Sequence, residues 1–490
     1  MIKNFKWLLL VSLSFVACDN NDENTVVEEP VSSGSADFAK YVALGDSFAA
    51  GYSDGALFKK GQEGSYVNIL SQQFAEAGGG AFAIPLMVDN IGGFSSGGVQ
   101  IPNFSTRLYF NGTGPVNVSG VSGTEITAHL TGSFNNMGIP GAKSYHLVAP
   151  GYGNIADVAT GAANPYFARF ASSAGTTVLA DALVQTPTFF SLWIGGNDVL
   201  GYATSGGIGV NQTGNLNPAT YGSNDITDPN VFANVYSSLV TNLTAGGAKG
   251  VVANLPFVST LPYFTTVPYD PVALTAGVAT QLNAGYAAYN GGLQFAASKG
   301  LISVAEAAQR TINFKAGSNA VVIEDSYLTN LTAYGIPSYR HATSADLMVL
   351  PSMNFIGTAI GGDPTKVNGV SVPLADKWVL SKEEIAEVKT ATDAYNVTIK
   401  AVADAKGLAF VDTKSMMTQL STGGIVSNSF TLTATYVTGG SFSLDGVHPS
   451  PRGYALIANA FSTAINAKYS STLKMVDVGL YSILYPAILP

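Results

Sequence analysis

Short runs of apolar residues recur along the chain, and stretches with helical spacing separate them. These runs lie at 41–44, 189–194, 251–255 and 408–411. Each run is continuous and does not alternate with polar residues, which is typical of strands in a parallel sheet that is covered on both faces. The pattern therefore predicts buried parallel strands spread over most of the chain.

The stretches between these runs carry signals for helix starts. Asp228 supplies a capping side chain ahead of a first-turn proline at Pro229. Ser381 and Glu384 have the spacing of a capping box, and Ser450 precedes the last helical pattern. Strands that alternate with helices form βαβ units. We therefore expect an α/β protein with a doubly wound, flavodoxin-like three-layer α/β/α sandwich and a mainly parallel sheet.

Two long stretches depart from this alternation. The first, near 77–133, is rich in Gly, Asn, Thr and Val, and the second lies near 311–373. We expect both to be loop or hairpin insertions, near the functional end of the sheet, in a main domain at 37–475. The apolar segment 476–490 contains Asp, Gly and Pro, and we expect it to dock on that domain as a tail.

The first residues of the chain have the pattern of a secretory signal. Lys3 and Lys6 precede an apolar run at 7–13, and a small residue, Ala17, follows. The run is too short to span a bilayer as a permanent helix. We therefore expect residues 1–17 to be a signal peptide and the protein to be exported.

The single cysteine of the chain, Cys18, follows directly after this segment. The arrangement resembles a bacterial lipoprotein signal, which implies that Cys18 is acylated and becomes the first residue of the mature chain. The polar segment 18–36 would then be a flexible tether to the membrane, at its periplasmic face or at the cell surface. The alternative is a cysteine without a role in a signal peptide.

Composition and charge exclude several classes of protein. Only 11% of the 490 residues are charged and 47% are hydrophobic, the reverse of a disordered chain. A chain with a net charge of −9 and no basic run has few groups that could neutralise phosphates, so we expect no nucleic-acid partner. One cysteine excludes an intrachain disulfide framework and a cysteine-ligated zinc site. Beyond the signal segment, no apolar stretch is long enough for a transmembrane helix.

Candidate catalytic residues follow the predicted strands or precede the last helix. In doubly wound sheets, ligands bind beyond the carboxyl ends of the strands. Ser47 comes after the first apolar run, Asn197 comes after the second, and Asp445 and His448 precede the last helical pattern. A serine hydroxyl needs an imidazole to take its proton, and the imidazole needs a carboxylate to orient it. An asparagine amide can donate to an oxyanion.

Four short blocks in this order resemble the SGNH hydrolase family, also called GDSL esterases and lipases. The blocks are GDS at 45–47, NMGIPG at 136–141, GGND at 195–198 and DGVH at 445–448. The chain is more similar to the long, lipoprotein-type members than to the compact ones, through GYSDG at 51–55 and PTFF at 187–190.

The resemblance implies a role for each candidate. Ser47 would be the nucleophile, His448 the general base and then acid, and Asp445 the residue that orients His448. The oxyanion donors would be the backbone N–H groups of Ser47 and Gly141 and the side-chain amide of Asn197. The implied enzyme is a serine esterase or lipase that hydrolyses carboxylic esters through an acyl-enzyme, without a cofactor. Its substrate would be a lipid ester or an acetylated glycan.

Other features of the sequence favour structural roles. We expect Asp46 and Asp198 to cap turns or hold loops. The remaining histidines, His129, His146 and His341, lack the spacing of metal ligands, so we expect no metal site. His146 lies close enough to the second block to line the cleft, although a packing role is favoured.

Ser95 lies in a Gly-x-Ser-x-Gly pattern, but the glycine, proline and asparagine that follow it disfavour the helix that a nucleophile elbow requires. A second function also stays open, a non-catalytic surface glycan-binding lipoprotein with a vestigial triad. Its binding platform would use aromatic residues of the insertions: Tyr109, Phe110, Tyr327 and Tyr339. The intact set of catalytic residue types favours the enzyme.

Overall fold

Five short, buried strands form a parallel sheet in the computed structural model, which describes residues 30–490. In chain order they are β1 (Tyr41–Gly45), β6 (Asn136–Gly138), β7 (Phe189–Trp193), β8 (Lys249–Ala253) and β15 (Ala409–Val411). Their order across the sheet is β15-β8-β7-β1-β6, and every neighbouring pair is parallel. By position in the chain this is the 2-1-3-4-5 order of a flavodoxin-like sheet, which confirms the predicted fold.

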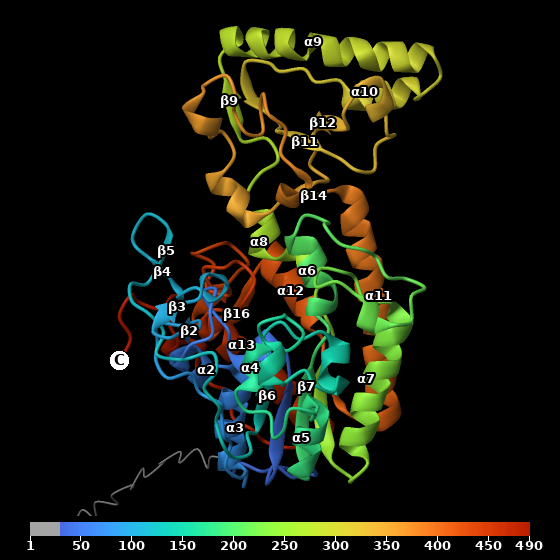
Figure 1. The fold of residues 1–490 in the computed structure, drawn as a ribbon. Helices are drawn as coiled ribbons and strands as arrows, with labels where there is room; N and C mark the ends of the chain where they lie inside the picture. Colours follow the sequence, from blue (N-terminus) through green and yellow to red (C-terminus); the bar gives the residue numbers. More distant parts are fainter. Residues whose placement is uncertain (1–29) are drawn as a thin grey trace, which may run out of the picture. The chain divides into compact units, whose positions relative to one another are not determined.

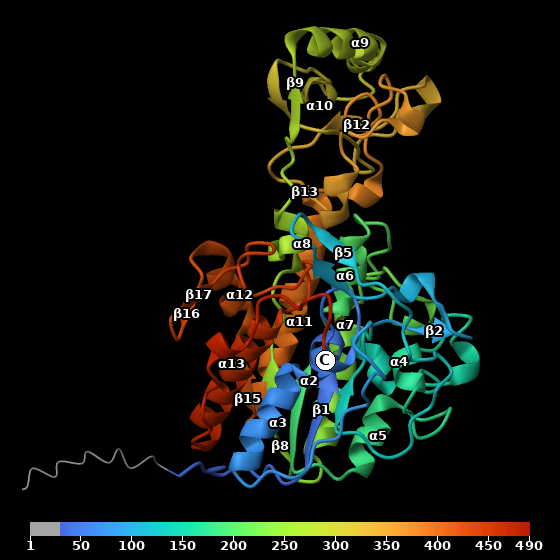
Figure 2. The same ribbon diagram turned by 90° about the vertical axis from the view of Figure 1, so that its left-hand side faces the viewer.

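Helices cover both faces of the sheet (Figures 1 and 2). One layer contains α3 (Tyr66–Glu76), α12 (Thr413–Thr422) and α13 (Pro451–Tyr469), and the other contains α5 (Val178–Val184), α7 (Pro229–Thr244) and α11 (Lys382–Lys406). Asp228 caps α7, Ser381 and Glu384 form the capping box of α11, and Ser450 caps α13. The three helix starts therefore use the capping residues that the sequence predicts.

Shorter helices lie mainly in the connections. They are α1 (Ser47–Ala50), α2 (Lys59–Glu63), α4 (Pro165–Ala168), α6 (Asn197–Thr204) and α8 (Pro262–Thr265). The segment 77–133 contains two short hairpins, formed by β2 (Ser95–Ser96) with β3 (Val99–Gln100) and by β4 (Leu108–Phe110) with β5 (Pro115–Asn117). A third hairpin, β16 (Ile425–Ser427) with β17 (Phe430–Leu432), follows α12.

The second departure from the α/β alternation is larger than the sequence suggests. Residues 266–380, here called the insertion subdomain, contain α9 (Ala276–Ser298), α10 (Val304–Arg310) and three strand pairs (Figure 1). The pairs are β9 (Val272–Leu274) with β10 (Gly317–Asn319), β11 (Val322–Glu324) with β12 (Tyr339–His341), and β13 (Leu347–Met348) with β14 (Val379–Leu380). Two apolar clusters form its core, apart from the cluster around the sheet. The expected insertion at 311–373 lies inside this subdomain.

The tail at 476–490 contacts the first insertion and the last helix. The Arg107 guanidinium donates to the carbonyl groups of Pro486 and Ala487, at 2.7 and 2.9 Å, and the Tyr485 ring packs edge-on against Phe58. Within the described residues, no helix has the length and apolar character needed to cross a bilayer. The expected signal peptide, Cys18 and the tether up to residue 29 lie outside the described residues.

Candidate active site

Ser47 lies at the carboxyl end of the central strand β1. Asp46 caps α1 by accepting a hydrogen bond from the Phe48 N–H at 3.0 Å, so that Ser47 becomes the first residue of this helix. In a flavodoxin-like sheet the chain reverses its direction of winding between the first and third strands, here β1 and β7, and ligands bind at this point. The fold therefore places Ser47 at the position where a ligand is expected.

His448 and Asp445 reach Ser47 from the loop before α13. The His448 Nε2 lies 2.9 Å from the Ser47 Oγ, and the His448 Nδ1 lies 2.9 Å from the Asp445 Oδ2. When Nδ1 donates to the carboxylate, Nε2 is free to accept the serine proton. The structure thus brings Ser47 together with Asp445 and His448, which lie about 400 positions later in the chain, in the order that proton transfer requires.

Asp445 is strongly held in its ionised form. Its Oδ1 accepts the backbone N–H groups of Val447 and His448, at 2.9 and 2.8 Å, and its Oδ2 also accepts the N–H of Gly55 at 2.9 Å. Burial raises the pKa of Asp445, but the neighbouring His448 ring and the backbone N–H groups of His448 and Val447 outweigh this effect and lower the pKa to about 2. The carboxylate is therefore charged at neutral pH and has few free acceptor positions.

The turn that contains Gly55 is a part of the site that sequence reasoning missed. The Asp54 N–H donates to the Ser443 Oγ at 3.0 Å, and the Asp54 Oδ1 accepts the Leu444 N–H at 2.9 Å. The other Asp54 oxygen is buried and has no hydrogen-bond partner in the described chain. The turn therefore fastens the loop that carries Asp445. The only signal was the GYSDG sequence at 51–55, to which no role was assigned.

The second sequence block is fastened to the first. The Asn136 side-chain amide donates to the Ala49 carbonyl at 3.0 Å, and the Ile139 N–H donates to the Gly45 carbonyl at 3.0 Å. Gly141 follows with a positive φ of 79°, and its N–H has no hydrogen-bond partner among residues 30–490. This N–H is therefore available to a ligand.

Asn197 contacts the same loop from the end of β7. Its Nδ2 donates to the Ala142 carbonyl at 3.0 Å, which leaves the second amide hydrogen for another acceptor. Gly195, two residues before it, has φ 122°, and a Cβ there would lie 2.7 Å from the Phe232 ring, so that only glycine fits. Asn197 and Gly141 are both expected to be oxyanion donors. They are close to each other, because Asn197 bonds to Ala142, the residue that follows Gly141.

The two other aspartates of the blocks hold loops, as expected. Asp198 is fully buried and accepts the Ser144 N–H and Oγ–H, at 2.8 and 2.7 Å, which ties the third block to the segment after the second. Asp46 caps α1, and burial raises its pKa to about 7, although the hydrogen bond from Phe48 opposes this effect.

The remaining histidines and Ser95 have structural contacts. The His146 ring stacks on Tyr152, its Nδ1 accepts the Lys143 N–H, and burial lowers its pKa to about 4. Ser95 lies in the β2–β3 hairpin, where Thr124 and Glu125 accept its hydroxyl. Among the described residues, no group of His, Cys, Asp and Glu has an arrangement that would hold a metal ion.

Apolar rings surround the reactive pair. The Phe48 and Tyr52 rings lie 5.5 and 4.6 Å from the His448 ring. Phe48 also lines a small apolar pocket of about 50 Å³. The other lining residues include Trp193, Leu261, Met416, Leu420 and Phe442. This pocket is small, and neither Ser47 nor His448 lines it.

A comparison with known protein families shows the family of the chain. A model of the family described as GDSL-like lipase/acylhydrolase matches residues 41–461, most of the chain. No curated protein sequence matches significantly.

Two solved structures are similar at 11% sequence identity. One is LAE5, an alpha/beta hydrolase enzyme from the metagenome of Lake Arreo, Spain, with a TM-score of 0.33 over 88% of this chain and 96% of that chain. The other is a mutant of Axe2, an acetyl-xylooligosaccharide esterase from Geobacillus Stearmophilus, with a TM-score of 0.31 over 89% of this chain and 97% of that chain. From the family match, the protein belongs to the GDSL-like lipases and acylhydrolases and is a hydrolase of ester bonds.

Proposed function

We propose that this hydrolase is a serine esterase in which Ser47, His448 and Asp445 act as a catalytic triad and form an acyl-enzyme. The observation that carries the proposal is the continuous chain of two 2.9 Å contacts from Asp445 through His448 to Ser47. The Asp445 carboxylate, 15% exposed and with a pKa of about 2, supports it, because that group stays charged while the imidazole accepts a proton.

The first half of the reaction forms the acyl-enzyme. The Ser47 Oγ attacks the carbonyl carbon of the ester, and His448 Nε2 takes the hydroxyl proton. Negative charge develops on the carbonyl oxygen, where the N–H groups of Ser47 and Gly141 and the Asn197 amide stabilise it. The bond from carbon to the alcohol oxygen then breaks, and the alcohol leaves with the proton that His448 held.

The second half returns the enzyme to its starting state. A water molecule attacks the acyl carbon while His448 takes one of its protons. The second tetrahedral species has the same oxyanion donors, and its collapse releases the carboxylic acid. His448 returns its proton to the Ser47 Oγ. Asp445 stays ionised throughout and stabilises the charged imidazole.

The test uses purified protein and p-nitrophenyl acetate. We expect Ser47→Ala to lose nearly all turnover and to keep only a residual rate, since triad removal typically costs about 10⁶ in turnover. Ser95→Ala is the matched control, because Ser95 is also a buried serine in a sequence that resembles a nucleophile motif. A fluorophosphonate probe should label Ser47 in the wild type and nothing in Ser47→Ala. Full turnover by Ser47→Ala, or equal loss in Ser95→Ala, would contradict the proposal.

We also propose that the protein is a lipoprotein anchored to a bacterial membrane through Cys18. The support comes from the sequence: two lysines, a short apolar run and a small residue directly precede the only cysteine. The test is incorporation of labelled palmitate in a bacterial host. The wild type should carry the label and fractionate with membranes, whereas Cys18→Ala should do neither. Label on Cys18→Ala would contradict the assignment.

A further inference from the structure

Arg107 is a buried arginine of the first insertion, and its guanidinium holds the tail at 476–490. The residue is 1% exposed. Its Nε donates to the Asn90 carbonyl at 2.8 Å, and one terminal nitrogen donates to the Pro486 and Ala487 carbonyls, at 2.7 and 2.9 Å. All three acceptors belong to the backbone. Because buried polar groups need hydrogen-bond partners, Arg107 and the tail hold each other in place.

Leu108 connects this contact with the turn at 53–56. It follows Arg107 directly, and its backbone N–H donates to the Asp54 carbonyl at 2.7 Å. Asp54 has a positive φ of 52°, which is uncommon for a residue other than glycine. Such a conformation persists only when the surrounding structure imposes it. The bond from Leu108 is therefore one of the contacts that keep this turn in shape.

The turn orients the carboxylate of the triad. It contacts the loop at 443–449, here called the catalytic loop, through the Gly55 N–H, which donates to the Asp445 Oδ2 at 2.9 Å. The same carboxylate oxygen lies 2.9 Å from the His448 Nδ1. The position of Gly55 therefore determines how the carboxylate faces the imidazole.

The charge of Arg107 acts on the same turn. One Asp54 oxygen is buried and has no hydrogen-bond partner among residues 30–490. Burial raises the pKa of Asp54 to about 7, and the charge of Asp445 adds to this effect, whereas the bond from Leu444 and the positive charge of Arg107 oppose it. The guanidinium and the turn are therefore coupled by charge as well as through Leu108.

From these contacts we propose that Arg107, held by the tail, is a positioning residue that orients Asp445 toward His448 through the turn at 53–56. The inference rests on the proposed function of the triad. The Arg107 side chain donates only to backbone carbonyls and not to the triad, so it acts on the geometry of the site. A small displacement of a catalytic group is enough to slow a reaction strongly.

Two changes break the same contact from opposite sides. Arg107→Met keeps a long side chain but removes the donors to the tail. A chain that ends at Leu484 keeps Arg107 and removes the Pro486 and Ala487 carbonyls. The shortened chain keeps the test open if Arg107→Met does not fold. Circular dichroism and the melting temperature check the folding of both.

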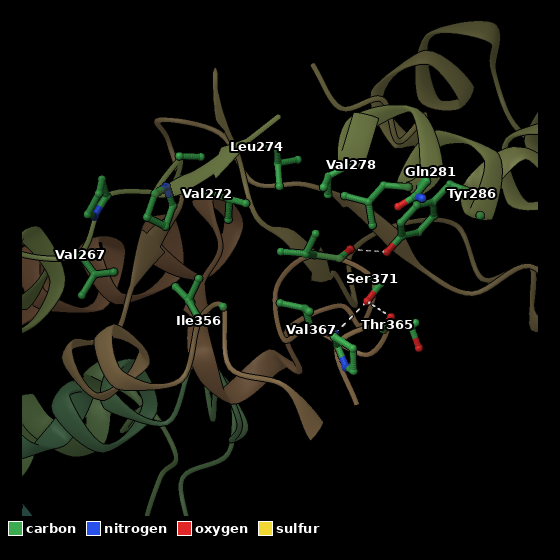
Figure 3. Close-up of a pocket in the computed structure, with 18 of the residues that line it drawn as sticks. Val267, Val272, Leu274, Val278, Gln281, Tyr286, Ile356, Thr365, Val367 and Ser371 are labelled. Carbon is green, nitrogen blue, oxygen red and sulfur yellow. Dashed lines mark hydrogen bonds between the residues drawn. The ribbon is translucent and has the colours of Figure 1, made fainter. Parts of the chain in front are cut away.

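The insertion subdomain supplies the matched control, Arg310→Met. Arg310 is also fully buried and donates to the Thr329 and Pro337 carbonyls, at 2.9 and 2.8 Å. The same subdomain has a pocket of about 990 Å³, whose lining residues, among them Leu274 and Tyr286 (Figure 3), come neither from the turn nor from the catalytic loop. The control therefore removes a buried arginine at a place without contacts to the turn.

The kinetic experiment measures kcat and KM on p-nitrophenyl acetate. Arg107→Met and the shortened chain should each lose about ten-fold or more of kcat and keep KM within about two-fold, because a misplaced triad affects the reaction more than binding. Arg310→Met should keep kcat within about two-fold. Unchanged kcat in the folded Arg107 variant or in the shortened chain, or an equal loss in Arg310→Met, would overturn the inference.

A proton NMR experiment separates this inference from the proposed function. The protein is Ser47→Ala, and the probe is the His448 Nδ1 proton, which resonates far downfield when it is bonded to the Asp445 carboxylate. Adding Arg107→Met, or shortening the chain, should move this signal upfield and speed its exchange with water, whereas adding Arg310→Met should leave it unchanged. Full turnover by Ser47→Ala would contradict the function and leave this result standing. A signal that neither change affects would overturn the inference.

Discussion

The catalytic end of the sheet and the insertion subdomain are held in place by different interactions. At the catalytic end, hydrogen bonds join residues that are far apart in the chain, such as Gly55 with Asp445 and Ser47 with His448. The subdomain has its own apolar clusters and a buried arginine, Arg340, between two aspartates. The comparison indicates that the reaction depends on the geometry of the core, and that the stability of the subdomain depends on its own packing.

The largest expected effect tests the catalytic side of this comparison. Asp445→Asn keeps the shape of the side chain but removes the charge and the acceptor that holds His448 in one tautomer. We expect turnover of p-nitrophenyl acetate to fall about 10⁴-fold. The far-ultraviolet circular dichroism spectrum should stay that of the wild type. A loss of less than ten-fold would show that the orientation of His448 does not depend on this carboxylate.

The next prediction tests the subdomain side. The Arg340 guanidinium bonds to Asp325 at 2.5 Å and to Asp346 at 2.6 and 2.8 Å, and all three side chains are buried. Arg340→Met leaves two carboxylates without a cation and should destabilise the subdomain by about 3–5 kcal/mol. Hydrogen exchange in 266–380 should rise sharply, whereas turnover of p-nitrophenyl acetate should change little.

An exposed ion pair of the same subdomain provides the control for Arg340. The Lys366 and Asp363 side chains are 63% and 39% exposed and lie 3.6 Å apart, so Lys366→Met should change stability by less than about 1 kcal/mol. If Arg340→Met abolished acetate turnover while the sheet stayed folded, the two regions would not be separable in the way that their contacts suggest.

The third prediction concerns one oxyanion donor. Asn197→Ala removes the side-chain amide that lies against the Ala142 carbonyl. We expect turnover to fall about 10²–10³-fold, which corresponds to about 2.7–4 kcal/mol of transition-state stabilisation. The loss should be in kcat more than in KM, because the donor acts on charge that develops during the reaction. A change in KM alone would assign Asn197 to substrate binding.

The smallest expected effect concerns the turn that fastens the catalytic loop. Burial raises the pKa of Asp54 to about 7, far above the value of about 3.9 in an unfolded chain. At pH values between about 3.9 and 7, Asp54 holds a proton in the folded protein but has lost it in the unfolded chain. The stability that protonated Asp54 contributes therefore declines as the pH rises toward 7. Asp54→Asn stays neutral, and its stability relative to the wild type should therefore be higher at pH 8 than at pH 5.

Urea unfolding at pH 5 and pH 8 measures this difference. Asp37→Asn, at an exposed aspartate, is the control for the loss of one negative charge. The relative stability of the control should hardly change with pH. The same change with pH in both variants would show that net charge, and not the burial of Asp54, is responsible.

The sequence predicted the sheet well where its strands are apolar and poorly where they are not. The four apolar runs correspond to β1, β7, β8 and β15. β6 was not predicted as a strand, because it has only three residues and two of them are Asn136 and Gly138. α9 was also missed, since its many alanines and glycines give it a weak pattern of apolar and polar faces.

The candidate site was accessible to sequence reasoning in part. Side chains with a chemical role, such as Ser47, His448 and Asn197, could be found through the motifs that carry them. The contribution of Gly55 could not, because a backbone N–H is common to nearly every residue and leaves no trace in the residue type. Only the folded chain shows that this N–H donates to Asp445.

The long separation of Ser47 and His448 along the chain has a consequence for biosynthesis. The ribosome adds His448 about 400 residues after Ser47. A nascent or prematurely terminated chain that stops before this histidine has a hydroxyl without a base. Under the proposed mechanism, such partly made chains cannot hydrolyse esters in the cell that makes the enzyme.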